Sequence, residues 1–101
     1  ARDQLINEAN KVTSQYDALL MPTTPTIAPP IKTLEEDEKL YLETNILTLR
    51  NTFCFNFLDR CALSIPMQHQ GEAPTGLMIV GETMGDHRLL SIGLTIEKAL
   101  K

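Results

Sequence analysis

The sequence Pro74-Thr75-Gly76-Leu77-Met78-Ile79-Val80-Gly81 carries the strongest structural signal in the chain, because Leu77 to Val80 is apolar without interruption. Successive side chains of a strand point to opposite faces of its sheet, so an unbroken apolar run needs cover on both faces. Strands of this kind are typical of sheets that carry helices. We therefore expect residues 77–80 to form a buried strand in a layered α/β structure.

Two further strands are expected earlier in the sequence. Residues 18–22 are again apolar on both faces and end at a proline, which indicates a strand covered on both sides. Residues 61–67 alternate, with the larger apolar side chains on one face. A helix between these two strands favours a parallel, right-handed crossover, whereas strand 77–80 should return antiparallel to strand 61–67.

Apolar residues that recur every three or four positions predict three helices, because this spacing places them on one helical face. The first helix lies within residues 1–16, the second runs from about Leu42 to Phe57, and the last begins with Asp86 as its N-cap. Thr33 and Glu36 have the spacing of a capping box before the second helix. The apolar stripes are Leu5, Ala9, Val12 and Tyr16, then Leu42, Ile46, Leu49, Phe53 and Phe57, and last Leu89, Ile92, Ile96 and Ala99.

The expected fold is therefore α/β and layered, with about three helices packed on a small mixed sheet of about three strands. A length of 101 residues allows one domain with one modest core. The chain begins at Ala1 and enters helical periodicity almost at once, which suggests a piece of a longer protein. Four prolines between Pro22 and Pro30 predict an ordered, extended loop after the first strand.

Composition argues against several classes of protein. The net charge is −4 and no basic stripe is present, so nucleic-acid binding has no electrostatic support. The apolar runs are far too short to cross a bilayer. Cys54 and Cys61 match no zinc-ligand spacing, and two cysteines are too few for a disulfide-stapled scaffold. We read both as reduced core residues of a cytoplasmic protein that uses neither a metal nor a cofactor.

Short motifs follow one another in a fixed order along the rest of the chain. They are Asp17 with Pro22-Thr23-Thr24-Pro25, Asn56-Phe57-Leu58, Ser64-Ile65-Pro66, Pro74 to Gly81, Asp86, Leu89-Leu90 and Glu97. Each motif is weak alone, but the ordered set resembles the last part of the amidase signature family. Asp59 and Cys61, on either side of Arg60, stand where many members have glycine and proline, and Gln68 stands where a glycine is common. These departures bear on the substrate subgroup more than on the fold.

The resemblance implies that residues 1–101 are the C-terminal segment of an amidase signature domain. Members of this family hydrolyse amide bonds with a serine nucleophile, a second serine in a cis peptide and a lysine, all in an upstream Gly/Ser-rich stretch. That stretch is missing here, because the five glycines are scattered and no lysine has a serine neighbour in the family's arrangement. We expect no catalytic residue in this chain, no amide hydrolysis by it alone, and a small-molecule amide as substrate of the full-length protein.

The loop after the first strand runs beside the substrate channel in amidases, so the resemblance implies that Thr23, Thr24 and Ile27 line that channel. Two other interpretations stay open: a rigid connection across the sheet edge, and a polyproline-type ligand for a recognition domain. The Asn56 amide is expected to bond backbone groups of the following turn.

Two alternatives come from other functional classes. A nucleophilic Cys/His pair would combine Cys54 or Cys61 with His69 or His87, although no catalytic local signature accompanies these residues and a buried thiol is inert. The chain could instead be a self-contained, non-catalytic binding or structural module. As an isolated segment of a larger domain, the chain provides too few helices to cover both faces of strands 18–22 and 77–80, which predicts self-association through an exposed apolar sheet face.

Overall fold

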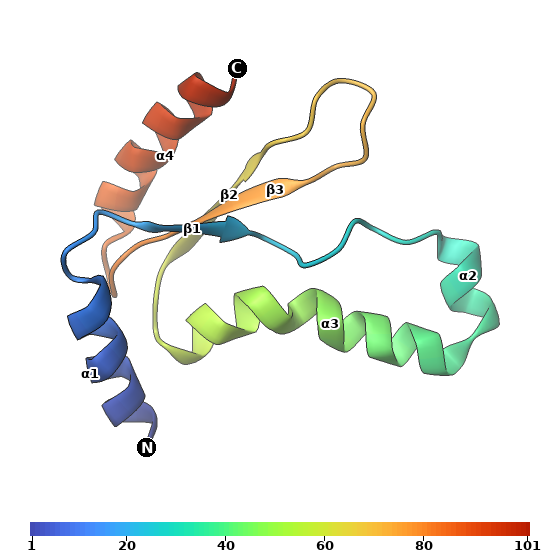
Figure 1. Cartoon of the computed structure of the whole chain (residues 1–101), viewed down its shortest axis with the longest axis horizontal. Coiled ribbons are helices and arrows are strands. Elements are labelled where there is room, and N and C mark those ends of the chain that lie inside the picture. Colours follow the sequence, from blue (N-terminus) through green and yellow to red (C-terminus); the bar gives the residue numbers. More distant parts are fainter.

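The computed structural model describes residues 1–101 as four helices and three strands (Figure 1). A short helix, α2, separates the first strand from the long helix α3, so the chain has one helix more than the sequence periodicity predicts. The elements are α1 (Arg2–Thr13), β1 (Leu19–Pro22), α2 (Ile31–Glu36), α3 (Glu38–Phe57), β2 (Ala62–Pro66), β3 (Gly76–Val80) and α4 (Asp86–Leu100).

The three strands form one sheet in the order β1-β3-β2. Both neighbours of β3 run antiparallel to it, with Val80 opposite Leu19 on one side and opposite Ala62 on the other. The layered α/β class is confirmed, and so is the antiparallel return of β3 along β2. The expected mixed sheet is wrong, because β3 lies between β1 and β2. These two strands run in the same direction but are not neighbours, so no parallel pair forms.

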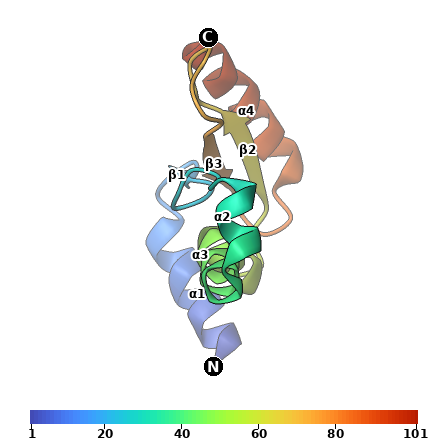
Figure 2. The ribbon, with the colours of Figure 1, turned by 90° about the vertical axis from the view of Figure 1, so that its right-hand side faces the viewer.

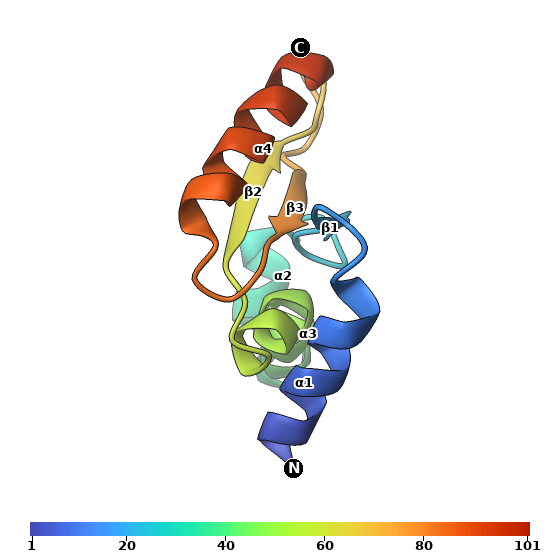
Figure 3. The same cartoon turned by 90° about the vertical axis from the view of Figure 1, so that its left-hand side faces the viewer.

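The core lies between the sheet and α4, which packs across β2 and β3 (Figure 3). Ile65, Ile79 and Leu89 are buried there, and partly buried side chains such as Leu63 surround them. Gly93 allows α4 to approach this closely, because a β-carbon at that position would overlap the Leu63 side chain. The alternation of apolar residues in β2 and α4 therefore produces the core as predicted.

Strand β3 is buried on both faces, as its continuous apolar run predicts. Met78 and Val80 point away from α4 but are only 2% and 0% exposed. The expectation that this strand contributes to an exposed sheet face is therefore wrong, because Met78, Ile79 and Val80 are all buried. The exposed sheet positions lie on the two edge strands, β1 and β2. Leu20 of β1 is 57% exposed, so the expectation that this strand is covered on both faces is wrong.

Helix α3 lies on the opposite side of the sheet from α4 (Figure 1). Its predicted apolar stripe does not face the sheet: Leu42, Ile46, Leu49 and Phe53 are all more than half exposed. The covered side is a different stripe, with polar residues at its centre. That stripe consists of Leu40, Thr44, Thr48, Asn51, Phe55 and Leu58.

The rotation of α3 is set by a polar contact with β1. Asn51 is 7% exposed, and its Nδ2 donates to the Pro22 carbonyl at 3.0 Å. Burying an amide without a hydrogen-bond partner costs several times more free energy than burying a bonded one. The bond to Pro22 therefore determines the rotation of α3, although it leaves apolar side chains exposed. Figure 2 shows α3 end-on beneath the strands. The side-chain amide that bonds a backbone group is thus that of Asn51. Asn56, for which such a bond was predicted, forms no side-chain hydrogen bond.

The helix ends differ from the predicted caps. Asp37 caps α3 by accepting a bond from the Leu40 backbone N–H at 3.1 Å, whereas Thr33 lies inside α2. Asp86 is the first residue of α4 and Gly85 occupies the N-cap position. The C-terminus of α3 turns at Asp59, which has a positive φ of 57°. None of the four helices has both the length and the apolar content needed to cross a membrane.

Candidate functional site

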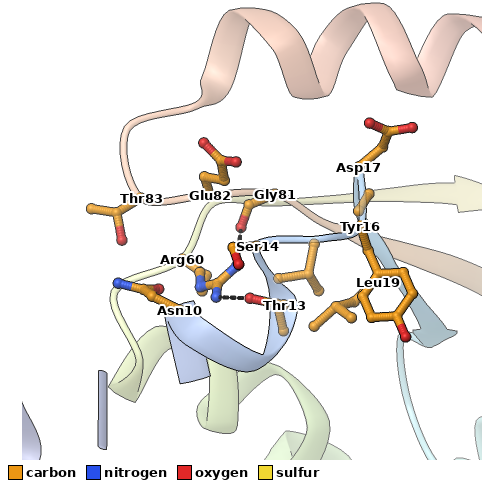
Figure 4. Close-up of a pocket in the computed structure, with 12 residues that line it drawn as sticks. Asn10, Thr13, Ser14, Tyr16, Asp17, Leu19, Arg60, Gly81, Glu82 and Thr83 are labelled. Carbon is orange, nitrogen blue, oxygen red and sulfur yellow. Dashed lines mark hydrogen bonds between the residues drawn. The ribbon is translucent and has the colours of Figure 1, made fainter. Parts of the chain in front are cut away.

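A pocket of about 300 Å³, lined mostly by polar residues, lies between α1 and the end of β3 (Figure 4). Its walls come from the last turn of α1, from the segment that leads into β1, and from the residues that follow β3. The lining residues are Asn10, Thr13, Ser14, Tyr16, Asp17, Ala18, Leu19, Arg60, Val80, Gly81, Glu82 and Thr83.

Arg60 joins the two walls of this pocket. Its Nη1 donates to the Gly81 carbonyl at 3.1 Å, and its Nη2 donates to the Thr13 hydroxyl at 2.5 Å. The Thr13 hydroxyl in turn donates to the Ala9 carbonyl at 2.8 Å. Because the guanidinium fork is rigid and permanently charged, these bonds hold α1 against the end of β3 at a fixed distance.

Two carboxylates, Asp17 and Glu82, give the rim of the pocket a negative charge. Arg88 of α4 reaches both, with its Nη2 2.7 Å from Asp17 Oδ1 and its Nη1 3.6 Å from Glu82 Oε1. These groups are largely exposed, so each pair contributes little to stability. Together Arg60 and Arg88 balance the two acids, and the pocket has no net excess of either charge.

The serine and threonine hydroxyls of the pocket are already engaged with the backbone. Ser14 donates to the Lys11 carbonyl at 3.0 Å, and Thr83 donates to the Asp59 carbonyl at 2.7 Å. A serine nucleophile needs a neighbouring base that accepts its proton, and no lysine or histidine lines this pocket. The arrangement therefore suits a structural joint or a small polar ligand and has no acyl-transfer apparatus.

The predicted channel residues lie elsewhere, in the loop after β1. The Thr23 N–H donates to the Gly76 carbonyl at 2.9 Å, which extends the pairing of β1 with β3. Its hydroxyl lies 2.5 Å from that of Ser64, directly above Gly76, where a β-carbon would collide with both oxygens. Thr24 donates to the Thr26 carbonyl within the loop at 2.9 Å, and Ile27 is 56% exposed. Thus only Thr23 is brought together with another predicted motif.

Neither cysteine occupies the position that a nucleophile needs. Cys54 is exposed, so its predicted place in the core is wrong, and Cys61 is half-buried. Burial raises the pKa of the Cys61 thiol above its ordinary value, and Asp86 adds to this effect. The Cys61 Sγ donates to the Glu82 carbonyl at 3.0 Å. A nucleophilic cysteine needs a lowered pKa and a basic partner, so the environment of Cys61 is unsuited to that role.

Sequence reasoning missed Arg60, Thr13 and Ser64 as members of these two clusters. Arg60 follows α3 with no periodic neighbours, and its partners lie far away in the sequence. Ser64 alone carried a signal, because it belongs to the Ser64-Ile65-Pro66 motif. No three potential metal-ligating side chains converge anywhere in the structure.

Comparison with known proteins identifies the class. The chain matches the Amidase family over residues 1–90 and belongs to that family. It is 32% identical over 97 residues to a subunit of the glutamyl-tRNA(Gln) amidotransferase of Thermotoga maritima, covering 96% of this chain and 19% of the relative. It is also 32% identical over 90 residues to the 2-amino-5-chloromuconic acid deaminase of Comamonas testosteroni, covering 88% and 19%.

The fold comparison agrees with the sequence comparison. The crystal structure of the same Thermotoga maritima amidotransferase subunit matches with a TM-score of 0.65 and 31% identity, covering 87% of this chain and 18% of that structure. The chain thus spans about a fifth of the length of these two relatives. What it resembles is the C-terminal part of amidase-family proteins.

Proposed function

We propose that residues 1–101 form the C-terminal segment of an amidase signature domain whose catalytic serines and lysine lie in other sequence. The observation that carries the proposal is the family match over residues 1–90 in a chain about one fifth the length of the Thermotoga maritima subunit. The pocket chemistry is consistent with it, because the hydroxyls around Arg60 are bonded to backbone carbonyls and no base stands beside them.

In this proposal the segment supplies scaffold and one wall of a substrate channel. Thr23 supports the second role, because its hydroxyl meets that of Ser64 over Gly76, where the absence of a side chain makes room for both oxygens. Thr24 and the exposed Ile27 follow in the same rigid, proline-rich loop. The substrate class is a small-molecule amide, and the reaction is hydrolysis of its carbon–nitrogen bond. Both free cysteines are compatible with a reducing compartment, so we assign the protein to the cytoplasm.

The test needs the full-length protein read from the gene that encodes this chain. We expect the continuous reading frame to encode a Gly/Ser-rich segment with a lysine before it, and the product to hydrolyse simple aryl amides. Thr23→Val and Thr24→Val should raise KM, whereas the matched change Thr33→Val in the exposed α2 should leave KM unchanged. A short gene that begins with methionine immediately before Ala1 would favour the self-contained module instead.

The isolated chain provides a second test. It should show no turnover of aryl or aliphatic amides, because a Ser/Lys mechanism needs a lysine side chain bonded to a serine, and no serine hydroxyl of this chain has such a partner. Turnover that survives purification and disappears in Cys61→Ala would contradict the proposal and would restore the thiol as a candidate nucleophile.

A further inference from the structure

The hydroxyl groups of Thr23 and Ser64 meet although their strands are not neighbours. Thr23 directly follows β1 and Ser64 lies in β2, with β3 between the two strands. Two strand spacings separate the backbones on either side of a central strand by roughly 10 Å. The two hydroxyl oxygens are nevertheless 2.5 Å apart. Side chains this short can meet only where the central strand places no side chain between them.

Gly76 of β3 provides that space. Its carbonyl accepts a bond from the Thr23 N–H at 2.9 Å, and Pro66 of β2 is its partner on the other side. A β-carbon at residue 76 would lie 2.5 Å from the Ser64 oxygen and 2.8 Å from the Thr23 oxygen, too close for either to stay in place. Gly76 has no positive φ that would require glycine. The contact between the two hydroxyls therefore explains why this residue lacks a side chain.

Three elements hold the chain where β1 ends and the proline-rich loop begins. Asn51 of α3 donates to the Pro22 carbonyl at 3.0 Å, and β3 accepts the bond from the Thr23 N–H. These two bonds fix the backbone. Ser64 of β2 supplies the third contact and forms the one hydrogen bond of the Thr23 side chain. Rotation about the Thr23 Cα–Cβ bond thus depends on Ser64.

The paired hydroxyls keep capacity for one more partner. Each hydroxyl has one proton and two lone pairs, and one of the two protons is used within the pair. Neither oxygen forms another hydrogen bond within the chain, so one O–H donor and several lone pairs stay free. An amide group offers a carbonyl acceptor and, when it carries hydrogen, an N–H donor. The pair is therefore complementary to an amide, provided that the Thr23 hydroxyl has a fixed direction.

We propose that Ser64 is a positioning residue, which holds the Thr23 hydroxyl in the one rotamer that orients it toward an amide substrate. The inference rests on the proposed channel role of Thr23, and it adds a residue from another strand that acts through Thr23. Threonine has three staggered rotamers, which exchange the places of its hydroxyl and its methyl group. Without Ser64 the backbone of Thr23 stays bonded, but its hydroxyl loses its direction.

Crystal structures of the full-length product of the gene test the positioning without any assay of activity. We expect a single Thr23 rotamer bonded to Ser64 in the wild type, and a second or rotated conformer in Ser64→Ala. Ser64→Thr keeps the hydroxyl and should keep the rotamer. The matched change Ser91→Ala removes a hydroxyl that bonds only its own helix, at 3.4 Å, and should leave Thr23 unchanged. An unaltered Thr23 rotamer in Ser64→Ala would overturn the inference.

Steady-state kinetics of the same proteins with a simple aryl amide test the consequence for the substrate. Ser64→Ala should raise KM about fivefold, the equivalent of one neutral hydrogen bond, and should leave kcat unchanged. Gly76→Ala should do the same, because its β-carbon separates the two hydroxyls while both are still present. Thr23→Val with Ser64→Ala should raise KM no further than Thr23→Val alone, since the two residues act as one unit. Ser64→Thr should restore KM, and Ser91→Ala should not change it.

The results separate this inference from the proposal on which it rests. A KM that rises in Thr23→Val but not in Ser64→Ala would overturn the positioning role and leave the channel role of Thr23 intact. A KM that changes in neither variant, or an absence of amide turnover in the wild type, would refute the channel proposal and this inference with it. Circular dichroism of each variant checks that a change in KM does not come from loss of the fold.

Discussion

Replacing Asp59 by glycine should stabilise the chain. Asp59 follows α3 with φ at 57°, in the left-handed region that glycine adopts without steric cost. Its N–H donates to the Asn56 carbonyl at 3.2 Å, and the next N–H, of Arg60, donates to the Phe55 carbonyl at 3.0 Å. These two bonds define a Schellman motif in which Asp59 holds the position that glycine usually occupies.

Three contributions set the size of the effect. Relieving the steric cost of a side chain in the left-handed region raises the free energy of unfolding by about 1 kcal/mol. Removing a carboxylate from the negative end of the α3 dipole raises the free energy of unfolding by roughly 0.5 kcal/mol. Glycine also increases the entropy of the unfolded chain, which costs about 0.7 kcal/mol. The net gain is about 1 kcal/mol, or a rise of roughly 5 °C in Tm for a chain of this size.

Thermal and urea unfolding of three variants separates these contributions. Asp59→Asn removes the charge but tolerates the positive φ, so it should gain less than Asp59→Gly. Asp59→Ala removes the charge but suits the positive φ less well, so it should gain nothing or lose stability. If Asp59→Gly is no more stable than Asp59→Ala, the backbone conformation at this residue is not what limits stability, and the reasoning fails.

Three further predictions concern contacts elsewhere in the structure. Arg60→Met should lower the free energy of unfolding by about 2 kcal/mol, measured in urea, because it removes both bonds that join α1 to the end of β3. Gly93→Ala should also destabilise, by about 1 kcal/mol, because overlap with Leu63 outweighs the helix propensity gained, and adding Leu63→Val should recover most of the loss. Burial and Asp86 raise the pKa of Cys61, so the unfolded chain loses the thiol proton at lower pH than the folded chain does. Stability should therefore fall as pH rises above the ordinary thiol pKa of about 8.5, and Cys61→Ala should remove that decline in urea midpoints.

The long helices were predictable because their apolar residues recur every three or four positions, and the strands because their apolar residues alternate or form short continuous runs. The apolar run at Leu77 to Val80 correctly indicated a strand buried on both faces. The order of strands was not predictable in the same way, since periodicity reports which faces are covered and not which strands are adjacent. A helix between β1 and β2 suggested that they are neighbours, but β3 pairs with both and separates them.

The polar clusters were harder to predict than the fold. Arg60 reaches Gly81 and Thr13, which lie 21 and 47 residues away along the chain. No spacing rule connects single polar residues over such separations, so only the folded chain reveals the pocket. The channel assignment of Thr23, Thr24 and Ile27 came from family resemblance, and it stays a prediction for the full-length protein.

The rotation of α3 shows why apolar periodicity alone gave the wrong buried face. The loop from Pro22 to Pro30 has few backbone donors, because four of its residues are prolines. The Pro22 carbonyl accepts its bond from the side chain of Asn51 instead. Once that amide is buried, Leu42 and Ile46 must lie on the far side of the helix, since they are about half a turn away. The apolar stripe that predicted a helix thus became its outer surface.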